Sequence, residues 1–154
     1  MALKTQLARF VGVGCASALL ALGGCAGSTG GYANNMQCAP YVRARTGVDL
    51  HGAAASWWWQ ARGRYQRTNR PVPGSILVLR SSPSMPYGHV ALVRSVEGRT
   101  LYIDHAHWEP GRIDINVPVA DVSPHHDWSR VRVWWAPSGR MGRRSNPVAG
   151  FIVP

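Results

Sequence analysis

A single thiol constrains the fold of this chain more than any other residue. The sequence has three cysteines, and two of them, Cys15 and Cys25, lie in or directly after an apolar N-terminal segment. The remainder keeps only Cys38, so no disulfide can close within it, and about 120 residues must fold around one hydrophobic core. A lone cysteine with histidines elsewhere in the chain is a candidate nucleophile.

The N-terminal segment is typical of an export signal. Basic residues precede an apolar run, Phe10 to Leu22, that is too short to span a bilayer. The run ends in Leu22-Gly23-Gly24-Cys25, which resembles a bacterial lipobox, in which the cysteine is lipidated and becomes the mature N-terminus. We therefore predict a signal peptide over residues 1–24 and a lipidated tether over residues 25–33, with ordinary signal cleavage nearby as the alternative. The expected location is the periplasmic side of a bacterial cell envelope, with the lipid anchor in the outer membrane.

Arginine makes the rest of the chain strongly basic. The formal net charge of the chain is +10, and Lys4 is its only lysine. Without the N-terminal segment the net charge is still about +8, which favours anionic partners, and in the envelope these are cell-wall polymers and anionic lipid. The sequence has no helix-turn-helix, zinc-finger or aromatic RNA-binding signature, so we expect no binding of nucleic acid.

Local patterns predict helices first and strands afterwards. A polar start and Gly47 past the end predict a helix that begins at or just before Cys38, and a second helical stretch runs from Gly52 to Tyr65. Runs of branched apolar and aromatic residues predict four strands: Ser75 to Leu79, His89 to Val96, Thr100 to His105 and Val131 to Trp135. This order predicts an α+β fold, in which N-terminal helices pack on an antiparallel β-sheet.

The last residues, 138–154, are predicted to form a flexible basic tail. They combine three arginines with Gly, Ser and Pro, a composition typical of disorder, and the arginines could contact an anionic surface. These arginines are Arg140, Arg143 and Arg144.

Two features of the predicted helices bear on chemistry. The free N–H groups and dipole at a helix N-terminus lower the pKa of a thiol, so we expect Cys38 to be partly thiolate near neutral pH. Three adjacent tryptophans, Trp57, Trp58 and Trp59, cannot all face one core, so at least one should be exposed or line a groove. One interpretation places them in the core with one ring partly exposed; the other makes Trp57 and Trp58 walls of a substrate groove, together with Trp108.

Four short motifs follow one another in a specific order around the single thiol. They are Gln37-Cys38 at a helix start, Pro73-Gly74-Ser75-Ile76 entering a strand, Gly88-His89-Val90-Ala91-Leu92-Val93 beginning the next, and His105-Ala106-His107-Trp108 ending a third. In order and spacing they resemble the CHAP domain, the cysteine- and histidine-dependent amidohydrolase/peptidase family, and the resemblance assigns residues 34–137 to this domain.

The resemblance implies a papain-like α+β fold and the cleavage of amide bonds in peptidoglycan. It is compatible with an N-acetylmuramoyl-L-alanine amidase or an endopeptidase, without a cofactor, and we expect a monomer. The alternative is a non-catalytic lipoprotein of the same fold that binds peptidoglycan or acts as a scaffold.

The resemblance also implies that Cys38 is the nucleophile and His89 its base. Such a site needs an imidazole to take the thiol proton, a third group to orient the imidazole, and donors for the oxyanion. Many relatives have Glu, any residue, then Asn at the end of the third strand, and His105 and His107 stand at the matching positions here. His105 can accept the N–H of His89, whereas Asp104 would be the stronger acceptor if a β-bulge rotated the strand end; we prefer His105 and keep Asp104 as the alternative.

Supporting roles fall to two further residues. Gln37 can donate to the oxyanion beside the backbone N–H of Cys38, and His107 is expected to support the site or contact substrate. A metal site is a weaker possibility, because zinc requires three or four convergent ligands and half of the candidates follow Pro124 in a predicted surface turn. Those candidates are Asp104, His105, His107, His125, His126 and Asp127, and we expect no metal.

Overall fold

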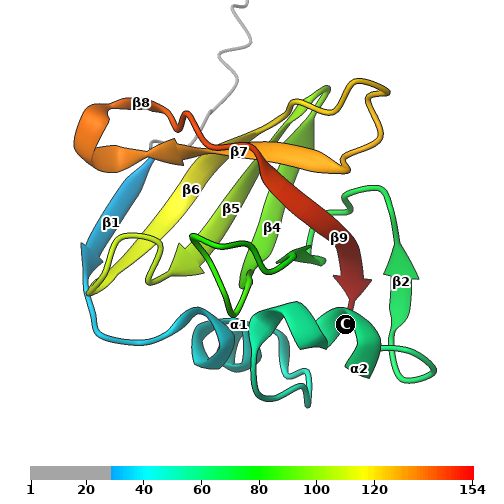
Figure 1. Ribbon diagram of the computed structural model, residues 1–154. Helices are drawn as coiled ribbons and strands as arrows, with labels where there is room; N and C mark the ends of the chain where they lie inside the picture. Colours follow the sequence, from blue (N-terminus) through cyan, green and yellow to red (C-terminus); the bar gives the residue numbers. More distant parts are fainter. Residues whose placement is uncertain (1–28) are drawn as a thin grey trace, which may run out of the picture.

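The computed structural model describes residues 29–154, and its strands close into a six-stranded antiparallel barrel (Figure 1). In order around the barrel the strands are β3 (Ile76–Leu79), β4 (His89–Glu97), β5 (Thr100–Ala106), β6 (Arg112–Asp121), β7 (Arg130–Trp135) and β9 (Asn146–Val153). Because β9 pairs with both β7 and β3, the sheet returns to the strand at which it started. Three short strands lie outside this ring: β1 (Gly30–Ala33) on β6, β2 (Gln66–Thr68) on β9 and β8 (Arg140–Met141) on β7.

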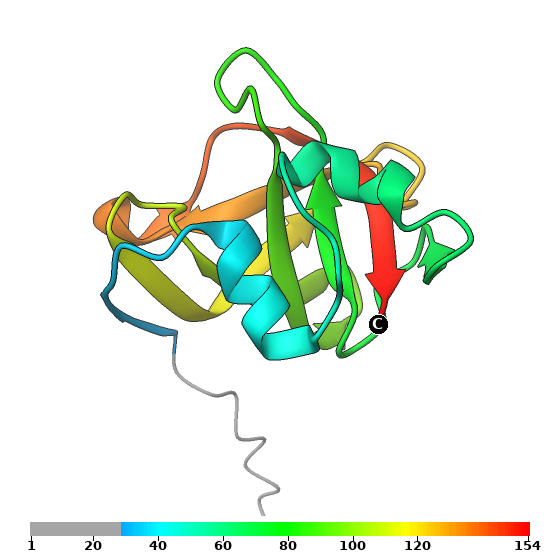
Figure 2. The ribbon, with the colours of Figure 1, turned by 90° about the horizontal axis from the view of Figure 1, so that it is seen from below.

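Two short α-helices lie on the outside of the barrel. The first, α1 (Cys38–Thr46), packs against β4 and β5 (Figure 2). It ends, as predicted, at Gly47, whose φ of +72° is left-handed. The second, α2 (Trp57–Gln60), follows the 3₁₀ turn η1 (Ala54–Ser56), and another 3₁₀ turn, η2 (Ala136–Ser138), separates β7 from β8. Within residues 29–154, no helix is both long enough and apolar enough to cross a membrane.

Alternation along the strands divides the core into two clusters. On β3, Leu77 and Leu79 belong to the cluster inside the barrel, whereas Ile76 and Val78 belong to the outer cluster beneath the helices. All four side chains are buried, because helices cover one face of this strand and the barrel interior covers the other. A strand buried on both faces is a continuous apolar run rather than an alternating one.

The predicted α+β fold class is wrong, because the sheet is a closed barrel with two short helices rather than an open sheet covered by N-terminal helices. The four predicted strands exist as β3, β4, β5 and β7, but the stretch from Gly52 to Tyr65 holds only η1 and the four residues of α2. Closure of the barrel depends on β6 and β9, which were not predicted. Pro118 in β6, and Pro147 with Gly150 in β9, are residues that normally argue against a strand.

Parts of the predicted tether and of the predicted flexible tail are ordered strands. Residues 30–33 form β1 on the edge of β6, and the predicted flexible tail, residues 138–154, forms β8 and β9. Phe151 and Ile152 of β9 are completely buried, so this segment has enough apolar surface to offset the entropy of ordering it. The C-terminal strand is therefore a structural part of the barrel.

Candidate active site

Two histidines meet at one end of the barrel. His89 begins β4 and His105 lies near the end of β5, and because the two strands are antiparallel these positions are neighbours. His89 Nε2 lies 3.2 Å from His105 Nδ1, and both rings are buried, with 5% and 1% of their surface exposed. Trp108 packs against both imidazoles, with ring centroids 5.0 Å from His89 and 5.6 Å from His105. The indole therefore shields the contact between the histidines from water.

Cys38 is the first residue of α1 and lies beside the start of β4. Gln37 is the N-cap but its side chain does not cap the helix, and Pro40 has no N–H, so the free donors of the first turn belong to Cys38 and Ala39. These two N–H groups and that of Val90, the residue after His89, act to lower the pKa of the thiol. The sulfur is thus surrounded by backbone donors next to the strand that carries His89.

Burial changes the expected ionisation of this pair. It raises the pKa of the Cys38 thiol by more than the three backbone donors lower it, so the prediction of a low thiol pKa is wrong. Burial also lowers the pKa of His89 to about 3, with His107 contributing in the same direction. Near neutral pH the resting pair is therefore a thiol and a neutral imidazole. Because His89 Nε2 faces His105, Nδ1 is the ring nitrogen that stays outside this contact.

The buried histidines should make the protein sensitive to acid. Their pKa values are lowered, to about 3 for His89 and well below the usual range for His105, while both should titrate near 6.5 in the unfolded chain. The unfolded state therefore binds these protons first, so the free energy of unfolding should fall as the pH drops from about 6.5 towards 3, by up to about 1.4 kcal/mol per pH unit for each histidine. Urea unfolding at pH 7, 5.5 and 4 measures this slope. His89→Leu should reduce this slope. An unchanged slope in His89→Leu would contradict the lowered pKa of His89 as its cause.

The acidic alternative to His105 is engaged elsewhere. Asp104 Oδ1 accepts the backbone N–H of Asn116 at 2.8 Å, and Oδ2 lies 3.5 Å from Nε of Arg94. The register of β5 against β6 does shift between Ile103 and His105, as a bulge would require. The structure nevertheless brings His105, not Asp104, to His89.

Gln37 and His107 contact each other in the cleft that holds Cys38. Gln37 Nε2 lies 3.3 Å from His107 Nδ1, which also accepts the backbone N–H of Gly111 at 3.4 Å. Both side chains line one cleft of about 1030 Å³ with Cys38 and His89. One N–H of the Gln37 amide is directed at His107, and the amide has a second N–H for another acceptor.

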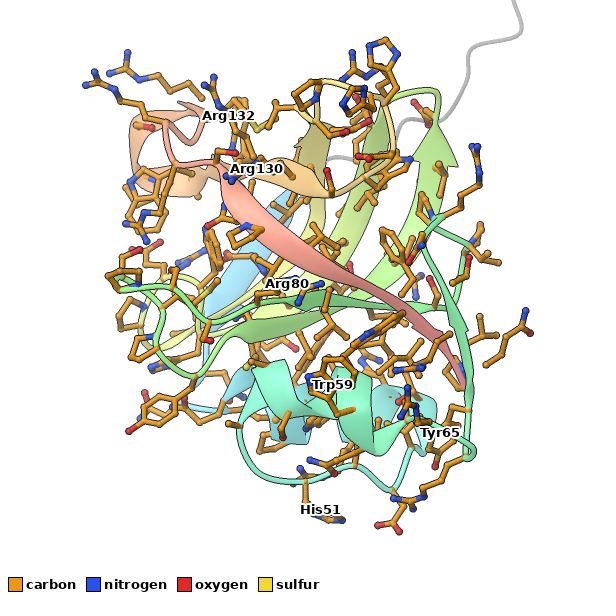
Figure 3. The ribbon with its side chains drawn as sticks, turned by 45° about the vertical axis from the view of Figure 1, so that its right-hand side comes forward. His51, Trp59, Tyr65, Arg80, Arg130 and Arg132 are labelled. Carbon is orange, nitrogen blue, oxygen red and sulfur yellow. The ribbon has the colours of Figure 1, made fainter. Side chains whose placement is uncertain are left out.

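The tryptophans divide between the cleft and the core. Trp108 lines the cleft, but Trp57 is completely buried in the outer core cluster, and Trp58 packs against that cluster beneath the guanidinium of Arg67. The prediction that Trp57 and Trp58 line the substrate groove is therefore wrong. Trp59, which Figure 3 shows on α2, is 61% exposed. Successive residues of a helix point in different directions, which is why the three rings separate.

The residues weighed as metal ligands do not converge, and the predicted lipidation site lies outside the described residues. His125 and His126 are exposed in the turn after Pro124, and within residues 29–154 no three His, Cys, Asp or Glu side chains converge as metal ligands. The signal peptide and the lipidation site at Cys25 fall outside the described residues and stay predictions.

Three arginines line the cleft although the sequence placed them in a flexible tail. Arg140, Arg143 and Arg144 follow Trp134-Trp135 on the segment between β7 and β9, and they share the cleft with Cys38. The dense arginine spacing was visible in the sequence. Its position was not, because it depends on β9 returning to the barrel.

Comparisons with known proteins agree with the motifs. The family model of the CHAP domain matches residues 27–107, slightly more than half of the chain. Two solved structures are similar: the crystal structure of Ly7917 with the hydrolyzing product of MDP, at 20% sequence identity, and that of Ly7917, at 19%, each with a TM-score of 0.46. The aligned region covers 80% of this chain and 56% of theirs, so the chain spans little more than half the length of these proteins. No curated protein sequence matches the chain.

Proposed function

Because the chain belongs to the CHAP domain family, we propose that it is a hydrolase that cleaves amide bonds in peptidoglycan through a cysteine nucleophile. The observation that carries the proposal is that Cys38 and His89 line one cleft, while His105 Nδ1 lies 3.2 Å from His89 Nε2. A thiol, a neutral base and a group that orients the base are the parts that such chemistry requires.

The proposed reaction begins with a neutral thiol. Cys38 Sγ attacks the carbonyl carbon of the amide while its proton passes to His89 Nδ1, and the carbonyl electrons move onto oxygen. Collapse of the tetrahedral intermediate expels the amine, which takes the proton from His89 and leaves a thioester on Cys38. Water then attacks the thioester and gives a proton to His89, which returns it to the sulfur as the carboxylic acid departs. His89 thus acts as general base and then as general acid.

Other groups around Cys38 and His89 support these reaction steps. The backbone N–H of Cys38 and the second N–H of the Gln37 amide are the donors for the oxyanion. His105 accepts the Nε2–H of His89, which keeps Nδ1 free for the thiol proton. That tautomer places the proton of His105 on Nε2, a buried atom without a hydrogen-bond partner among the described residues. Trp108 keeps water away from both rings.

Digestion of purified peptidoglycan tests the proposal. Fragments released by the full chain and resolved by mass should show new ends created by hydrolysis of an amide. A stem peptide released whole from the sugar identifies an amidase, and a peptide cut internally identifies an endopeptidase. Sedimentation of the protein with the wall without release of any fragment would instead favour the non-catalytic binding protein.

The role of His105 can be separated from that of Asp104 by three substitutions. His105→Asn keeps an acceptor oxygen near the position of Nδ1, whereas His105→Leu keeps a similar shape without an acceptor. We expect His105→Leu to lower kcat/KM for wall digestion about 10²-fold and His105→Asn to restore most of the loss. Asp104→Asn should change kcat/KM less than about threefold, because that carboxylate contacts Asn116 and Arg94 rather than the base. A larger loss of kcat/KM in Asp104→Asn than in His105→Leu would instead make Asp104 the residue that orients His89.

A further inference from the structure

One wall of the cleft carries an uncompensated positive charge. Arg140, Arg143 and Arg144 are exposed and line the cleft that holds Cys38, and no Asp or Glu is among its lining residues. In the part of the chain that the structure describes, none of these three guanidinium groups forms an ion pair. This positive charge therefore favours the binding of an anion that enters the cleft from solvent.

The backbone that carries the arginines is held in place. In β8, Arg140 pairs with Trp135 and Met141 with Trp134, and the next residue, Gly142, donates its N–H to Val133 O at 2.9 Å. A Cβ on Gly142 would lie 2.6 Å from that oxygen, so the close approach requires glycine.

At its other end the segment is fixed by a buried amide. Asn146 is 2% exposed, and its Nδ2 donates to Arg144 O at 3.4 Å and to Val131 O at 3.3 Å. A fixed backbone thus holds the three arginines close together. Less conformational entropy of this segment is then lost when an anion binds.

The side chains and the proposed substrate together indicate a carboxylate ligand. Guanidinium groups present paired N–H donors that match a carboxylate or a phosphate better than lysine does, and the anionic group that a peptide substrate carries is a carboxylate. Trp135 and Met141 line the same cleft and offer apolar surface for the uncharged part of a ligand. The three arginines lie outside residues 27–107, so the family match does not account for them.

We propose that Arg140, Arg143 and Arg144 form a subsite that binds a free carboxylate of an acidic peptide next to the amide to be cut. This inference rests on the proposed function, which it deepens by naming the charge of the peptide that the cleft selects. The subsite acts on binding, and the reacting groups are Cys38 and His89.

Binding to peptidoglycan with and without free carboxylates tests the subsite. The probes are purified peptidoglycan and the same material after its carboxyl groups have been converted to amides with carbodiimide and ammonia. The full chain with Cys38→Ala, which cannot consume the probe, should sediment with the native wall at about tenfold lower Kd than with the amidated wall. Adding Arg140→Gln/Arg143→Gln/Arg144→Gln should remove this preference and leave the Kd for the amidated wall unchanged.

A matched variant controls for net charge. Arg70→Gln/Arg130→Gln/Arg132→Gln removes the same charge from exposed positions that do not line the cleft; Arg130 and Arg132 lie on β7 in Figure 3. This variant should keep the preference for the native wall within about threefold. Equal losses in both triple variants, or no loss in the cleft variant, would overturn the subsite.

The two proposals fail separately. Cysteine-dependent cleavage at equal rates on native and amidated wall would overturn the carboxylate subsite and leave the hydrolase standing. A carboxylate preference that depends on the three arginines, in a protein that releases no fragments, would support the subsite and overturn the hydrolase.

Discussion

Cys38→Ala should abolish the release of fragments from peptidoglycan, lowering the rate at least about 10³-fold. No thioester can form without the sulfur, and the backbone donors around it can polarise the carbonyl but cannot replace the nucleophile. The measurement is the rate of fragment release from purified wall, resolved by mass, for the full chain and the variant. Cys38→Ser should be nearly as inactive, because an alkoxide is much harder to form than a thiolate at this site.

The structure provides the control for this experiment. Cys38 is only partly buried at the edge of the outer core cluster, so its truncation should leave the urea midpoint of unfolding almost unchanged. Release by Cys38→Ala at the rate of the unmodified protein would refute the proposed mechanism.

His89→Ala should cause a loss of similar size, because the resting thiol is not ionised and needs a base at the moment of attack. The double variant Cys38→Ala/His89→Ala should be no slower than either single variant, since the two residues act as one unit. His51→Ala is the matched control: this histidine is exposed, pairs with Asp49 at 2.7 Å and lies on the far side of the helices (Figure 3). Its rate should stay unchanged. Full activity in His89→Ala would remove His89 from the mechanism.

The residues brought together at the site were largely visible in the sequence, because local patterns mark their positions. A helix start was predicted at Cys38 and a strand start at His89, and each lies where its pattern placed it. His105 was preferred to Asp104 as the partner of His89, and in the structure it is His105 that contacts His89, while Asp104 contacts the backbone of Asn116. Periodicity and capping act over a few residues, so they can be followed without knowledge of the fold.

The barrel and the ionisation of the site depend on contacts between distant residues. Closure joins β9 to β3 across about 70 residues of chain, and no local pattern in a segment that contains Pro147 and Gly150 predicts it. The Gly150 backbone is approached closely by the Trp58 ring, a contact between two segments that look unrelated in the sequence. The burial of His89 and its packing on Trp108 also depend on the fold, so the direction of the pKa shifts could not be predicted from the sequence.

The position of β9 near the end of the described residues also determines when the barrel can close. A ribosome delivers Cys38 and His89 long before residues 146–153, yet β3 and β7 have no shared neighbour until that strand arrives. The growing chain therefore carries Cys38 and His89 before the barrel can close, and closure requires residues 146–153.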